Sequence, residues 1–202
     1  DPPDILHAML FHANIAARVI GPLAGLAIQR ILCEIQTVER ERPWHLVIDN
    51  LSCRLCRQEI GNSPSVIEHL RCQAHIPRSR LHCESGGVDT RRFSTVAPLP
   101  KADLGIPENE PMILWTGRLD PVKGFEEMLA AFAQVNRRRP ARLVLAGEGE
   151  YRHKIEKLIE YHRIQGRVLL LGRRSDIAEL LKTADVFLFC SRTEGLPNAL
   201  LE

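Results

Sequence analysis

The sequence predicts an α/β protein with two domains, each built around a parallel sheet. Short apolar runs alternate with amphipathic stretches along the chain, which is the pattern of strands that are each followed by a helix. Residues 98–111 contain four prolines and little periodicity, which is typical of a linker. We therefore expect an N-terminal domain over residues 1–97, a C-terminal domain over residues 112–202, and a ligand cleft at the carboxyl ends of the strands.

The second half shows the alternation most clearly. Buried strands are expected at Met112–Thr116, Leu143–Ala146, Val168–Leu171 and Val186–Cys190. Apolar residues recur at helical spacing from Phe125 to Val135, from Ile155 to Ile159 and from Ile177 to Leu181. A final helix is expected to start near Pro197, because proline has no N–H and the first helical turn needs none.

The first half repeats this rhythm less regularly. Helix-like segments separate four expected strands, at Ile5–His7, Ile31–Ile35, Glu59–Asn62 and Leu81–Cys83. The first half is therefore predicted to be a second α/β unit.

The composition is that of a globular protein. Of the 202 residues, 45% are hydrophobic and 26% are charged, and the formal net charge of +2 is too small to imply a nucleic-acid partner. The densest basic run, Arg137–Arg139, complements the C-terminal end of a predicted helix. The most apolar stretch, Val19–Ile28, is too short to cross a bilayer.

Six cysteines include one closely spaced pair, Cys53 and Cys56. Structural zinc sites generally use two such pairs. Scattered reduced thiols in a cytosolic protein are therefore the favoured interpretation, with a zinc site as the alternative.

The residues from Trp115 to Gly124 lie between a predicted strand and a predicted helix. Gly117 permits close approach of the backbone to a ligand, and a helix start attracts anions. Arg118 and Lys123 add two cations, whose natural counterpart is a phosphate or diphosphate. An ordinary surface loop in which Arg118 pairs with Asp120 is an equal alternative.

A second strand-to-helix segment, from Ser191 to Glu202, carries two glutamates eight positions apart. We expect Glu194 in the loop and Glu202 on the second turn of the helix, where their carboxylates can accept hydrogen bonds from hydroxyls of a sugar and a ribose. Backbone N–H groups at the helix start face a bound anion; they belong to Gly195, Leu196 and Asn198. The alternative is a common acidic helix cap.

Together these motifs resemble the retaining glycosyltransferases of family 4, which have the GT-B fold of two Rossmann-like domains. The resemblance rests on GRLDPVKG at 117–124, LVLAGEGE at 143–150, SRTEGLPNALLE at 191–202, and the run from Val168 through Gly172 and Asp176 to Asp185. The first half adds DILHAMLFHAN at 4–14, VERERPWH at 38–45 and GGVDTRRF at 86–93. On this resemblance both domains are incomplete, and the chain is expected to be a fragment, inactive as it stands.

The resemblance implies a role for each site residue. They are Gly117, Arg118 and Lys123 at the donor diphosphate, Glu202 at the ribose, Gly172 and Arg173 near the nucleobase, His7 at the transferred sugar, and Glu194 with the loop of Gly195, Leu196, Pro197 and Asn198 at the sugar and its phosphate. Arg118, Lys123, Glu194 and His7 are the expected catalytic residues. Negative charge builds on the leaving phosphate during transfer, so fixed cations and amides are expected to supply the main stabilisation.

The resemblance also implies the ligands. The expected donor is a UDP- or GDP-sugar, which is a substrate, and no separate cofactor is expected. The sequence has no Asp-x-Asp motif, and metal independence is expected, with Arg118, Lys123 and helix amides in place of a cation. The acceptor is a glycan, a lipid or a small molecule. The expected location is the cytoplasm, with peripheral contact at the cytoplasmic face of the membrane.

Two positions depart from the family pattern. The family often has two histidines one residue apart where this chain has His7 and Met9, so a structural or solvated histidine is the alternative for His7. Gly86 and Gly87 stand in place of the usual Asn-Gly. A GT-B epimerase or hydrolase, and a non-catalytic nucleotide-sugar-binding module, are therefore the alternatives to a transferase.

Overall fold

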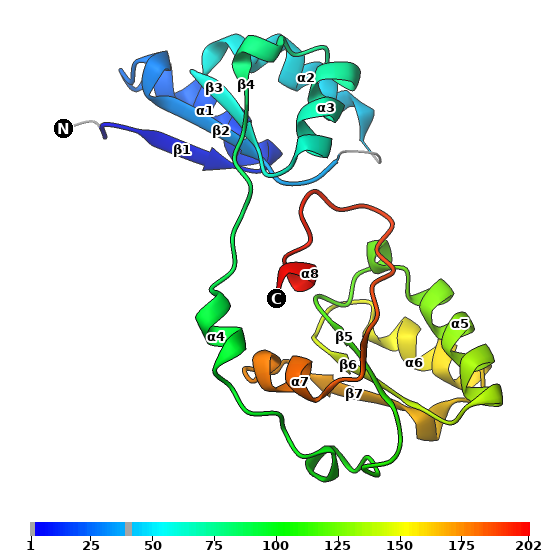
Figure 1. The fold of residues 1–202 in the computed structure, drawn as a ribbon. Helices are drawn as coiled ribbons and strands as arrows, with labels where there is room; N and C mark the ends of the chain where they lie inside the picture. Colours follow the sequence, from blue (N-terminus) through cyan, green and yellow to red (C-terminus); the bar gives the residue numbers. More distant parts are fainter. Residues whose placement is uncertain (1–2, 39–41) are drawn as a thin grey trace. The chain divides into compact units, whose positions relative to one another are not determined.

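The computed structural model describes residues 3–38 and 42–202, so Glu39, Arg40 and Glu41 of the VERERPWH motif lie outside the described residues. The chain forms two compact units (Figure 1), Asp1–Gly87 with Thr193–Pro197, and Val88–Arg192 with Asn198–Glu202. Each unit contains a four-stranded parallel sheet, as predicted. Residues 88–97, which the sequence groups with the first domain, belong to the second unit.

The first unit has its strands in sequence order, β1-β2-β3-β4. Its elements are β1 (Leu6–Met9), α1 (Phe11–Leu23), β2 (Ile31–Ile35), α2 (Pro43–Ser52), β3 (Gln58–Gly61), α3 (Pro64–Gln73) and β4 (Leu81–Cys83). Since crossovers between parallel strands are right-handed, this order places the three helices on the same face of the sheet (Figure 1).

The predicted end of the first strand is wrong. Its pairing with β2 runs from Leu6 opposite Ile31 to Met9 opposite Glu34, and the next residue still donates its N–H to the Glu34 carbonyl. His7 is therefore the second residue of β1 and does not end it. The ladder sets this boundary, because each added pair satisfies backbone groups that would otherwise lack partners.

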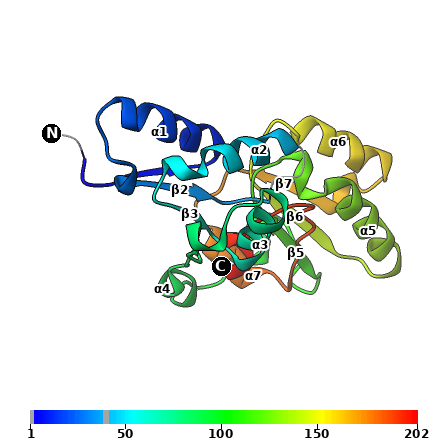
Figure 2. The same ribbon diagram turned by 90° about the horizontal axis from the view of Figure 1, so that it is seen from above.

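The second unit has the strand order β7-β6-β5-β8. Its elements are α4 (Thr90–Ser94), β5 (Met112–Thr116), α5 (Phe125–Arg138), β6 (Arg142–Ala146), α6 (Arg152–Tyr161), β7 (Val168–Gly172), α7 (Ile177–Thr183), β8 (Val186–Phe187) and α8 (Asn198–Leu201). Figure 2 shows α5 and α6 on one side of this sheet and α7 on the other. The described residues contain no helix long and apolar enough to span a bilayer.

Two predictions at the C-terminal end are wrong. Strand β8 stops at Phe187, well short of Cys190, because the chain turns away from the sheet and Arg192 donates its backbone N–H to the Val122 carbonyl. Helix α8 is a single turn that follows Pro197, so Glu202 lies just after the helix and not on a second turn.

The predicted linker packs against the second unit. Ile106 is 2% exposed and lies in one apolar cluster with Leu114 and Leu180. The Asp185 carboxylate accepts hydrogen bonds from Lys101 Nζ at 2.8 Å and from the Met112 N–H at 2.7 Å. The linker is therefore fixed to the sheet of the second unit by packing and by charge-assisted hydrogen bonds.

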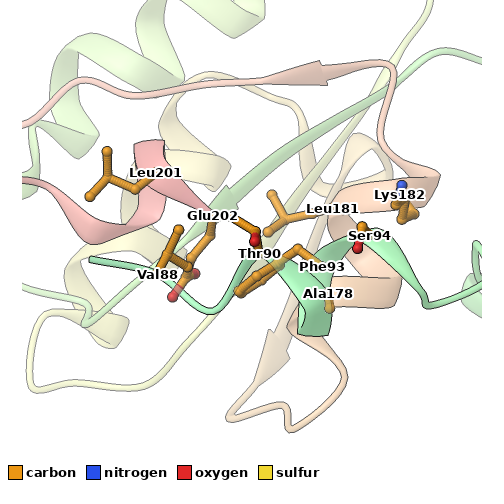
Figure 3. A pocket seen from close by; sticks show the side chains of 9 residues that line it. All are labelled: Val88, Thr90, Phe93, Ser94, Ala178, Leu181, Lys182, Leu201 and Glu202. Carbon is orange, nitrogen blue, oxygen red and sulfur yellow. The ribbon is translucent and has the colours of Figure 1, made fainter.

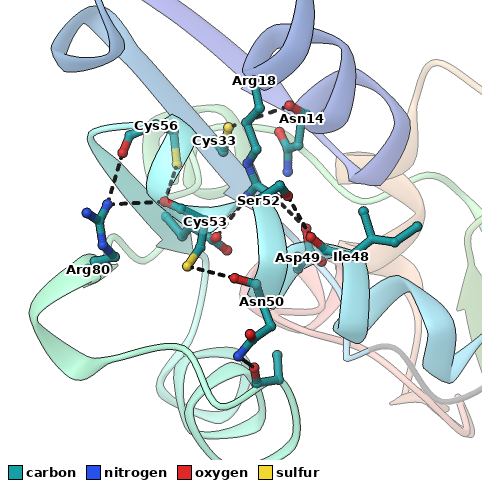
Figure 4. Close-up of polar contacts among 12 residues, drawn as sticks. Asn14, Arg18, Cys33, Ile48, Asp49, Asn50, Ser52, Cys53, Cys56 and Arg80 are labelled. Atoms are coloured by element: carbon teal, nitrogen blue, oxygen red, sulfur yellow. Dashed lines mark hydrogen bonds and ion pairs between the residues drawn. The ribbon is translucent and has the colours of Figure 1, made fainter.

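A buried cation joins the helices and the sheet of the first unit (Figure 4). The Arg18 side chain on α1 is fully buried, and its guanidinium lies 2.8 Å from Asp49 on α2 and 2.9 Å from Glu59 on β3. It also donates to Ser52 Oγ at 2.8 Å. One cation thus faces two buried carboxylates, and burial raises the pKa of Glu59 to about 8.

We expect Arg18→Ala to lower the free energy of unfolding of the first unit by about 3–5 kcal/mol, because it leaves the buried Asp49 carboxylate and the buried Glu59 carboxyl group without the cation that faces them. Urea denaturation followed by circular dichroism measures this. Arg71→Ala is the control, since Arg71 forms an exposed pair with Glu68 on α3 and should change stability little. Equal losses in the two variants would contradict the role of the buried cation.

Glu59 also predicts a pH dependence. Between its ordinary pKa of 4.5 and its raised pKa of about 8, the folded chain keeps a proton that the unfolded chain has released. The free energy of unfolding should therefore fall as the pH rises through this window. Glu59→Gln should flatten the profile, and an unchanged slope in that variant would assign the dependence to another group.

Candidate functional site

Three glycines let the loops after β5 and β6 pack backbone against backbone. The Gly117 N–H donates to the Ala146 carbonyl at 3.1 Å, where the two strands end side by side. A Cβ on Gly147 would overlap the carbonyl oxygen of Gly117, and a Cβ on Gly149 would overlap that of Leu119. Both sites therefore require the absence of a side chain.

The loop after β8 is held against the same edge. Gly124 has φ of 71°, and a Cβ on it would overlap the carbonyl oxygen of Cys190. Arg192 then reaches across to α5, where its Nη2 lies 2.7 and 2.9 Å from the two carboxylate oxygens of Glu127. The carboxyl edge of this sheet is thus a layer of interlocked loops.

Arg118 projects from this layer. Its side chain is 75% exposed, and its Nη2 lies 3.3 Å from Asp120 Oδ2. The pairing with Asp120 that the sequence left open is therefore present. An exposed ion pair of this kind is weak, so the guanidinium can exchange it for a phosphate at little cost. Lys123 ends the short 3-10 turn Pro121–Lys123 in the same loop.

Gly172 and Arg173 lie at the next strand of the edge. Gly172 ends β7 with φ of 70°, a conformation that favours glycine. A Cβ on it would lie 2.9 Å from Glu148 Oε1, in the loop after β6. Arg173 follows as an exposed residue. These residues therefore share an edge with Gly117, Arg118 and Lys123, as the strand order requires.

Glu202 lines a separate cavity of about 300 Å³ in the second unit (Figure 3). Val88 and Thr90 of the GGVDTRRF motif and Lys182 of α7 line it as well. Two motifs that are far apart in the sequence therefore meet here. Arg118 and Lys123 do not line this cavity.

The other predicted site residues belong to the first unit. His7 Nε2 lies 3.0 Å from Glu34 Oε2, so the imidazole already has a carboxylate partner. Glu194, Gly195, Leu196 and Pro197 group with this unit, whereas Asn198 groups with the second. A Cβ on Gly195 would overlap the Gln36 carbonyl oxygen, so this segment packs closely on the edge after β2.

Sequence reasoning missed the residues that shape the edge. In the sequence, Gly147 and Gly149 are only part of the LVLAGEGE motif, and no motif role points to Arg192 or Glu127. The Gly-x-Gly spacing directly after a strand was a usable signal for close backbone contact. Nothing in the sequence pairs Arg192 with a residue 65 positions earlier. Among the described residues, no group of three or more His, Cys, Asp or Glu could hold a metal ion.

Residues 98–202, just over half of the chain, match the family described as glycosyl transferases group 1. The chain belongs to this family. The match covers the whole glycine-rich edge of the second unit, from the loop after β5 to α8.

Two curated relatives illustrate the similarity. The chain is 34% identical over 153 residues to the lipopolysaccharide core biosynthesis glycosyltransferase LpsE of Rhizobium meliloti, covering 76% of this chain and 41% of LpsE. It is 34% identical over 116 residues to a GDP-mannose-dependent phosphatidylinositol monomannoside mannosyltransferase of Corynebacterium glutamicum, covering 54% of this chain and 30% of that protein. The chain thus spans less than half the length of these relatives.

Solved structures share the fold. Anabaena HepE, crystallised with UDP-glucose, matches with a TM-score of 0.80 at 21% identity, over 93% of this chain and 53% of HepE. The two parallel sheets are those of the GT-B glycosyltransferases, as the motifs led us to expect.

The glycine contacts make a testable prediction. Gly147→Ala should destabilise the second unit by about 1–3 kcal/mol, because the new Cβ meets a backbone oxygen that has no room to move. Thermal denaturation measures the loss. Gly166→Ala is the matched control, since a Cβ there meets nothing within 4 Å. Equal stability of the two variants would contradict the interlocked edge.

Proposed function

We propose that this chain supplies the donor site of a glycosyltransferase that moves a sugar, with retention of configuration, from a nucleotide diphosphate to an acceptor. The observation that supports this proposal most directly is the glycine-packed edge of the second unit, from which the Arg118 guanidinium projects. The donor is a UDP- or GDP-sugar. The GDP-mannose-dependent relative and HepE crystallised with UDP-glucose support both classes. The acceptor is a glycan, a lipid or a small molecule, and the proposed location is the cytoplasm.

Arg118 and Lys123 bind the donor diphosphate in this proposal. As the bond to the sugar breaks, negative charge grows on the leaving phosphate, and fixed cations stabilise it more than they stabilise the ground state. Arginine suits this task because its planar fork makes two parallel hydrogen bonds to phosphate. The two cations stabilise the charge of the leaving phosphate in place of a metal ion, and the reaction uses no cofactor.

The remaining predicted residues recognise the rest of the donor. Glu202 accepts hydrogen bonds from the ribose hydroxyls, and its position in a cavity of about 300 Å³ supports this. Gly172 and Arg173 lie near the base. Glu194, with the loop that follows it, and His7 face the transferred sugar. The Glu34 carboxylate lies 3.0 Å from Nε2 of His7 and can hold the orientation of the imidazole ring.

We expect Arg118→Ala and Lys123→Ala each to weaken the binding of UDP and GDP by roughly tenfold or more, because each removes a charge-assisted hydrogen bond to the diphosphate. Isothermal titration calorimetry with UDP, GDP and the nucleosides uridine and guanosine tests this. The nucleosides should bind the variants and the parent chain alike. Arg138→Ala, at the exposed C-terminal end of α5, is the charge-matched control. Unchanged affinity in the first two variants would remove the phosphate assignment.

A further inference from the structure

The edge of the first sheet opposite the carboxyl ends carries an uninterrupted row of arginines. Arg30 directly precedes β2, Arg57 directly precedes β3, and Arg80 directly precedes β4. Because the strands are parallel and adjacent, these residues follow one another along the amino edge. Arg54 and Arg78 lie in the same loops.

The loops before β2, β3 and β4 contain no acidic residue, and Asp4 precedes β1 at the same edge. Segments 20–33, 50–58 and 74–83 hold the five arginines and no aspartate or glutamate. The guanidinium groups that make hydrogen bonds donate to backbone carbonyls, and Arg80 joins two loops by donating to the carbonyls of Cys53 and Cys56 at 3.1 and 3.2 Å. No salt bridge of the described residues includes any of the five. Arg30, Arg54, Arg57 and Arg78 are exposed.

In the second unit, the arginines at the equivalent edge form ion pairs with a carboxylate. Arg142 begins β6, and Arg167 directly precedes β7, at the equivalent edge of the second sheet. Both form ion pairs with the Glu110 carboxylate, and Arg142 Nε lies 2.7 Å from it. The fold therefore accommodates a carboxylate at this position. At the amino edge of the first sheet, Arg30 and Arg57 are instead exposed to solvent, and Arg80 is half-buried against two backbone carbonyls.

Exposed leucines accompany these arginines. Leu23 at the end of α1 is 83% exposed, Leu51 near the end of α2 is 75% exposed, and Leu55 in the next turn is 38% exposed. Each helix runs back against its strands, so its C-terminal end lies at the amino edge of the sheet. The helix α1 also exposes Val19 and Ile20 to solvent. Arg18 is the single charged residue of this helix, and its side chain is buried. The edge is therefore both basic and apolar.

We infer that this basic and apolar edge of the first unit docks on the surface of an anionic lipid bilayer. Arginines bind the lipid phosphates, while the leucines enter the boundary between headgroups and acyl chains. Nucleic acid is the less suitable occupant, because these loops offer no Phe, Tyr or Trp side chain on which bases could stack. Docking here leaves the carboxyl edge of the same sheet clear of the membrane.

Co-sedimentation of the purified chain with vesicles tests this inference. The chain should bind vesicles of phosphatidylcholine with phosphatidylglycerol, bind phosphatidylcholine alone weakly, and lose affinity as salt rises. Combined Arg54→Glu, Arg57→Glu and Arg78→Glu should weaken binding by more than about tenfold. Combined Leu23→Ser and Leu51→Ser should also weaken it, with the salt dependence retained.

The matched control reverses three other charges. Arg137→Glu, Arg138→Glu and Arg139→Glu change the exposed end of α5 in the second unit by the same charge, and should leave vesicle binding unchanged. UDP binding and circular dichroism should be the same in all variants, which separates this inference from the proposed donor site. Equal vesicle binding by the two triple variants would overturn the inference. So would binding to single-stranded DNA with none to the anionic vesicles.

Discussion

The carbonyl oxygen of Gly117 occupies the space that a side chain on residue 147 would need, and the carboxyl edge of the second sheet depends on this contact. It follows from the register of β5 and β6, whose last pair is Thr116 with Ala146. The two loops leave the sheet side by side and must touch through their backbones. Only glycine permits such a contact between backbones. The contact also sets the direction in which the loop after β5 carries Arg118.

The two units differ in the apolar clusters and ion pairs that hold their interiors together. The second has an apolar cluster on each face of its sheet, one of them larger than either cluster of the first unit, and most of its ion pairs lie near the surface. The first also has two apolar clusters, and in addition a fully buried arginine between the acidic side chains of Asp49 and Glu59. A buried ion pair adds little net stability but is costly to break, so Arg18 fixes how α1, α2 and β3 pack more than it strengthens them.

Each unit exposes arginines at one edge of its sheet, the carboxyl edge in the second unit and the amino edge in the first. At the carboxyl edge of the second unit, Arg118 projects beyond packed glycine loops, where an anionic ligand can reach it. At the amino edge of the first unit, arginines that form no ion pair with the described carboxylates lie beside exposed leucines. The small net charge of +2 conceals both features, because the 25 acidic residues of the chain nearly balance its 27 lysines and arginines in the sum.

The sequence by itself determined the fold class and most of the strands, since apolar periodicity reports directly on which residues are buried. The strands Ile31–Ile35, Leu81–Cys83 and Met112–Thr116 were predicted to the residue. It also placed Arg118 and Lys123 in a loop after a strand, because the order of elements along the chain fixes which edge a loop occupies. Tertiary structure alone decided where β1 and β8 end, because ladder partners and competing loop contacts set those boundaries. It alone also decided that Arg18 is buried and that Arg192 reaches Glu127, since both depend on contacts between residues far apart in the sequence.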